Sequence, residues 1–78
     1  MVEIRYCVRW NYYPHAARLA AKIKEELGLD STLIMGKAGE FSVRYKGIKI
    51  AEKGDPISGQ GFPSQKDVII RIQKHLEK

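Results

Sequence analysis

One cysteine stands at the junction between a strand pattern and a helix pattern. Cys7 follows the alternating run "VEIRY" and shortly precedes "HAARLAAKIKEEL", in which apolar residues recur at helical spacing. The unpaired N–H groups and the dipole of a helix start place partial positive charge near such a sulfur. Arg9 and His15 are close in sequence, and nearby cations also favour the thiolate that attacks disulfides. Cys7 is therefore a candidate redox nucleophile.

A structural role explains the same cysteine equally well. Cysteine is among the most buried residue types and often packs as a small hydrophobic side chain. The position three residues further on, where a dithiol motif has its second sulfur, is Trp10, and the chain has no other cysteine. Trp10, Tyr12 and Tyr13 make this loop rich in aromatic residues, which favour contact surfaces. The residues alone leave both interpretations open.

Composition limits the class of protein. The 78 residues predict a single domain over residues 1–78, and 44% hydrophobic with 29% charged residues is typical of a folded chain. One cysteine excludes a disulfide framework and a cysteine-rich zinc site, so we expect a reducing compartment, the cytoplasm. We find no signal sequence, no run long enough to cross a membrane, and no spacing that predicts a metal site or a bound cofactor.

Basic residues give a formal net charge of +5 but are dispersed, which is typical of a solvated surface. "GKAG" at residues 36–39 matches the GXXG loop of RNA-binding KH domains, yet a strand pattern follows it where those domains have a helix. "GDPISGQG" lacks the Gly-Lys-Ser/Thr ending of a phosphate-binding loop. Nucleic acid is therefore the least favoured partner.

Hydrophobic periodicity indicates the elements that position Cys7. Residues 2–7, 31–35, 40–46 and 48–53 have the composition or alternation of strands, and Gly47 marks a hairpin turn between the last two. A long loop, "KGDPISGQGFP", follows and is of a length that is often functional. With one helix after the first strand and one at the end, the order is β-α-β-β-β-α. This predicts an α/β chain of the α+β type, with two helices packed on one small mixed sheet.

Both helices show an apolar stripe and end signals. The first is expected to begin after Asn11 as the N-cap, with Pro14 in its first turn, and to end before Gly28. The second is expected to follow Ser64, with Asp67 completing a short capping box. The predicted buried residues are Ala16, Leu19, Ala20, Ile23 and Leu27 in the first helix, and Val68, Ile69, Ile72 and Leu76 in the second.

These segments, in this order, resemble the selenoprotein W-like proteins, also called the Rdx family. "VEIRYC" is similar to the family's first strand, "AARLAAKIKEEL" to its first helix, "GEFSVRYKGIKIAEK" to its central hairpin, and "GFP" to its turn before the last helix. The resemblance covers nearly the whole chain and implies a thioredoxin-like fold. It also implies thiol redox chemistry with glutathione or protein thiol partners.

The family's motif is Cys-x-x-Cys or Cys-x-x-selenocysteine, and this chain departs from it. Cys7 matches the first position, whereas Trp10 replaces the second, so a mixed disulfide on Cys7 would be resolved from outside, for instance by glutathione. The resemblance thus implies a monothiol redox protein, such as a thiol-disulfide oxidoreductase that lacks the resolving cysteine. A redox-inactive interaction module on the same scaffold is the alternative. The expected partner contacts are Val8, Arg9, Trp10, Phe62 and Pro63.

Overall fold

The computed structural model describes residues 2–54 and 61–76. Residues 55–60 of the predicted long loop lie outside the described residues. The observed order of elements is the expected one. The strands and helices are β1 (Val2–Tyr6), α1 (Tyr13–Leu27), β2 (Ser31–Met35), β3 (Phe41–Tyr45), β4 (Ile48–Glu52) and α2 (Gln65–Leu76).

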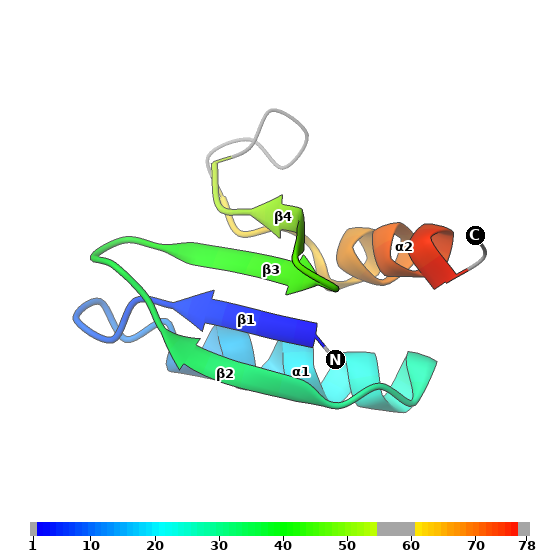
Figure 1. Cartoon of the computed structure of the whole chain (residues 1–78). Coiled ribbons are helices and arrows are strands. Elements are labelled where there is room, and N and C mark those ends of the chain that lie inside the picture. Colours follow the sequence, from blue (N-terminus) through cyan, green and yellow to red (C-terminus); the bar gives the residue numbers. More distant parts are fainter. Residues whose placement is uncertain (1, 55–60, 77–78) are drawn as a thin grey trace.

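The four strands form one mixed sheet in the order β2-β1-β3-β4 (Figure 1). β1 pairs with β2 in parallel and with β3 in antiparallel, and β3 pairs with β4 in antiparallel. Because β1 lies between β2 and β3, residues 36–40 must cross its C-terminal end. "GKAG" therefore joins two strands, as its sequence context predicted, and does not join two helices.

The core lies between the helices and one face of the sheet. Ile4 pairs with Leu33 on one side and Val43 on the other, so their side chains point to the same face. Residues from both helices belong to the same buried cluster as Ile4 and Val43. Alternation places the charged side chains of Glu3 and Arg5 on the opposite face. The cluster consists of Val2, Ile4, Ala16, Leu19, Ile23, Phe41, Val43, Tyr45, Ile50, Ala51, Val68, Ile69 and Ile72.

The start of α1 differs from the prediction. Asn11 is not the N-cap: its N–H donates to the carbonyl of Val8 at 3.1 Å, and its φ is +56°. Asn11 therefore closes a turn over residues 8–11, and Tyr12 takes the N-cap position without a side-chain cap. Pro14 lies in the first turn of the helix, as expected, and Gly28 ends it in the left-handed conformation with φ +70°.

The start of α2 agrees with the prediction, but its end does not. The backbone N–H of Asp67 donates to Ser64 Oγ at 3.0 Å, which confirms the cap. Val68, Ile69 and Ile72 are buried, whereas Leu76 is 43% exposed. The prediction of a buried Leu76 was wrong because the last turn of α2 extends past the ends of the strands (Figure 1). Helical periodicity predicts which side of a helix is apolar, but it does not predict how far along the helix the sheet covers that side.

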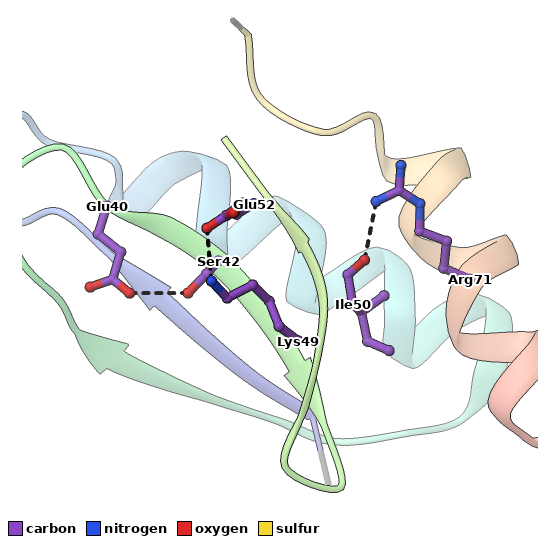
Figure 2. Close-up of polar contacts among 6 residues, drawn as sticks. All are labelled: Glu40, Ser42, Lys49, Ile50, Glu52 and Arg71. Atoms are coloured by element: carbon purple, nitrogen blue, oxygen red, sulfur yellow. Dashed lines mark hydrogen bonds and ion pairs between the residues drawn. The ribbon is translucent and has the colours of Figure 1, made fainter. Parts of the chain in front are cut away.

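The β3–β4 hairpin has a two-residue turn and a bulge. Lys46 and Gly47 have φ values of +53° and +80°, as a tight hairpin turn requires. The register shift between Val43 and Arg44 leaves Ile50 as an extra residue in β4. Arg71 of α2 donates to the carbonyl of Ile50 at 3.1 Å, which joins this helix to the bulged strand (Figure 2).

Candidate thiol site

Cys7 is buried immediately after β1, which ends one residue earlier than predicted. Its side chain is 1% exposed. The backbone N–H of Trp10 donates to Cys7 Sγ at 3.3 Å, and the N–H of Tyr12 donates to the carbonyl of Cys7 at 2.9 Å. The turn of residues 8–11 therefore folds around the sulfur. A molecule from solvent reaches the thiol only when this turn moves.

Several large apolar side chains are exposed near the buried sulfur. Trp10 is 58% exposed, and Arg9 next to it is exposed as well. Met35 at the end of β2 is paired with Tyr6 and is 72% exposed. The ring of Tyr6 in turn meets the ring of Tyr13 edge to face, with 5.6 Å between centroids. The described residues of this end of the sheet that expose large apolar side chains are Val8, Trp10, Tyr13 and Met35.

A second loop, residues 36–40, lies against the turn that encloses Cys7. A Cβ atom on Gly39 would come within 3.0 Å of Trp10 Cζ3, so the indole ring rests on the Gly39 backbone. The φ of Gly39 is +77°, a conformation that glycine adopts without strain. The sheet order brings the two loops together at one end of the molecule, at the left in Figure 1.

Glu40 holds this second loop in shape. Its Oε1 accepts a hydrogen bond from the backbone N–H of Lys37 at 2.9 Å. Its Oε2 accepts one from the hydroxyl of Ser42 at 3.2 Å, which Figure 2 shows. The backbone N–H of Glu40 also donates to the carbonyl of Lys37 at 3.0 Å. The Lys37 N–H, followed by the Ser42 hydroxyl and the charges of Arg5 and Lys37, lowers the pKa of Glu40 below its ordinary 4.5.

This lowered pKa predicts how the stability of a Glu40→Gln variant depends on pH. Since Glu40 binds its proton more weakly when folded, its carboxylate stabilises the native state above pH 4.5, and this contribution is lost as pH falls through the folded-state pKa. We expect Glu40→Gln to lower the free energy of unfolding at pH 7 and to have a smaller effect near pH 3. Urea unfolding at both pH values measures this. An equal loss at both would contradict it.

Phe62 and Pro63 lie on the inner side of the same region. Pro63 is buried, and Phe62 is partly buried against the core. The ring of Phe62 stacks on His15 with 3.9 Å between centroids and an interplanar angle of 14°. It also meets Tyr12 at 4.7 Å and Phe41 at 5.1 Å, both edge to face. This aromatic cluster anchors the segment before α2 to the start of α1, and Tyr12 links it to Cys7.

The structure brings together part of the predicted site and adds residues to it. Cys7 and Trp10 are in contact, whereas Phe62 is joined to them through Tyr12. Gly39 and Glu40 were missed as site residues, although "GKAGE" before a strand contains the signal of a structured turn. Among residues 2–54 and 61–76, no group of three or more His, Cys, Asp or Glu side chains is placed to hold a metal ion.

The sequence matches the model of the Rdx family over residues 1–74. This chain belongs to the Rdx family. A search of the curated proteins found no match. Solved structures similar to this Rdx protein include the following two. One, from Bordetella parapertussis, has a TM-score of 0.84 and 25% identity, with 95% of this chain and 94% of that chain covered. The other is a selenoprotein W-related protein from Vibrio cholerae, with a TM-score of 0.82 and 23% identity. The match covers 96% of this chain and 94% of that chain.

These comparisons confirm the fold expected from the sequence resemblance. This Rdx chain has a thioredoxin-like α+β fold, in which a mixed four-stranded sheet carries two helices. Cys7 follows β1, one of the two inner strands of that sheet. In the described ranges, neither helix has the length and apolar character needed to cross a membrane.

Proposed function

We propose that this Rdx protein is a thiol redox protein that acts through Cys7 alone. The observation that carries the proposal is the position of Cys7, between the end of β1 and the start of α1, with the Trp10 N–H directed at its sulfur at 3.3 Å. Membership of the Rdx family supports a redox role. Because Cys7 is the single cysteine of the chain, each cycle requires a thiol from another molecule.

The proposed chemistry is thiol–disulfide exchange in two steps. The Cys7 thiol loses its proton, and the thiolate attacks one sulfur of a partner disulfide, so that a mixed disulfide forms and the partner's other sulfur leaves as a thiolate. That thiolate takes up the proton that Cys7 lost. An external thiolate then attacks the mixed disulfide and releases Cys7. The co-substrate is glutathione or a protein thiol, and the reducing cytoplasm would return Cys7 to its thiol form.

Incubation with oxidised glutathione tests the proposal directly. We expect intact-protein mass spectrometry to show one glutathione per chain, and the adduct to disappear after addition of reduced glutathione. The Cys7→Ser variant should gain no adduct while keeping its circular dichroism spectrum. If the folded protein gains no adduct, and gains one after unfolding in urea, Cys7 is a structural cysteine and the redox proposal is wrong.

A redox-inactive interaction module is the second candidate, and one pair of observations favours it. Cys7 is 1% exposed, while the side chains of Trp10 and Met35 beside it are largely exposed. Exposed apolar side chains that gather in one area are typical of protein contact surfaces. This candidate requires that Cys7→Ser keeps partner binding and that Trp10→Ala weakens it. The reverse pattern would favour the redox proposal.

A further inference from the structure

We propose that the turn of residues 36–40 controls access to the Cys7 thiol by holding the indole of Trp10. The inference rests on the proposed function, because access to the thiol matters only when Cys7 exchanges disulfides. The control of access itself depends on the contacts between the two loops. It assigns positioning roles to Gly39 and Glu40, which lie outside the family's Cys-x-x-Cys segment.

Trp10 is the connection between the thiol and the second loop. Its backbone N–H bonds to Cys7 Sγ, and its ring lies on the Gly39 backbone. The turn that encloses the sulfur can open only if the hydrogen bond from this N–H to Cys7 Sγ breaks. The N–H and the indole ring belong to the same residue, so the two move together. The contact with Gly39 therefore opposes opening of the turn.

The loop under the indole is itself fixed at both ends. The backbone N–H of Gly36 donates to the carbonyl of Tyr6 at 2.8 Å, one residue before Cys7. At the other end, the Glu40 carboxylate accepts from the Lys37 N–H and from the Ser42 hydroxyl. With both ends bonded, Gly39 presents a fixed surface, and the indole has one preferred position. Rigid support of this kind is how a neighbouring loop sets the geometry of a site.

The matched variants Gly39→Ala and Gly47→Ala test the inference. Both glycines have positive φ, +77° and +80°, so alanine introduces similar backbone strain at each. The Cβ at Gly39 meets the indole, whereas a Cβ at Gly47 meets nothing within 4 Å. We expect Gly39→Ala to raise the alkylation rate of Cys7 in the folded protein by about threefold to tenfold, and Gly47→Ala to change it much less.

Fluorescence supplies a second readout, because Trp10 is the single tryptophan of the chain. We expect the emission maximum to shift in Gly39→Ala and to stay unchanged in Gly47→Ala. In a Trp10→Ala background, Gly39→Ala should add no further increase in alkylation, since the ring that it displaces is gone. If Gly39→Ala does not fold, Glu40→Ala replaces it, because this change loosens the loop without strain at Gly39.

Equal alkylation rates for Gly39→Ala and Gly47→Ala, at equal thermal stability, would overturn the inference. So would an unchanged tryptophan spectrum in Gly39→Ala. Failure of the proposed function gives a different result. In that case the folded protein forms no mixed disulfide with glutathione, yet the two variants still differ in their alkylation rates.

Discussion

A Trp10→Cys variant, treated with oxidised glutathione, is expected to release the glutathione and keep an internal disulfide. In the natural chain we expect the mixed disulfide on Cys7 to persist, because no second thiol is present. The backbone N of residue 10 already lies 3.3 Å from Cys7 Sγ, so a thiol at this position starts close to the sulfur that it must attack. Intramolecular attack benefits from a high effective concentration. We expect the steady level of mixed disulfide to fall by at least about tenfold.

The internal attack balances as an exchange reaction. The new thiolate attacks the Cys7 sulfur of the mixed disulfide, an internal S–S bond forms, and glutathione leaves as a thiolate that takes up the proton. Mass spectrometry distinguishes the two products by the mass of one glutathione. The matched control is Trp10→Ser, which also removes the indole but adds no thiol and should keep the adduct. A persistent adduct in Trp10→Cys would show that position 10 does not reach the sulfur.

An Ile4→Ala variant is expected to lose about 2–5 kcal/mol of unfolding free energy, which is much of the 5–15 kcal/mol typical of a domain. Ile4 is fully buried in β1, an inner strand of the sheet, and lies between Leu33 and Val43. Its truncation leaves a cavity that the flanking strands cannot close without shifting. Urea unfolding followed by circular dichroism measures the loss.

The control for Ile4→Ala is the same substitution at Ile48, which is half exposed at the start of β4. We expect Ile48→Ala to change the unfolding free energy by about 0.5 kcal/mol or less. Since β1 positions Cys7, Ile4→Ala should also speed alkylation of the thiol through global opening. Comparable losses for the two variants would contradict the assignment of Ile4 to the centre of the core.

Local patterns were sufficient to predict the elements of this fold. The alternation of Phe41, Val43 and Tyr45 identified β3, and the position of Gly47 identified its hairpin, because strand pairing across a two-residue turn depends on neighbouring residues. The stripe through Ala16, Leu19 and Ile23 identified α1 for the same reason. Local patterns failed at Asn11, which belongs to the turn over the sulfur and is not the N-cap of α1. They also failed at Leu76, which is exposed because α2 extends past the ends of the strands.

The sequence by itself determined that Cys7 is the single cysteine of the chain and stands between a strand and a helix, whereas its place in the family's redox motif stays a prediction from resemblance. Only the tertiary structure decided that this sulfur is buried, and that Gly39 and Glu40 support the indole beside it. The physical reason is the sheet order. Placing β1 between β2 and β3 carries residues 36–40 across the end of β1, and such long-range pairing leaves no trace in the periodicity of either segment.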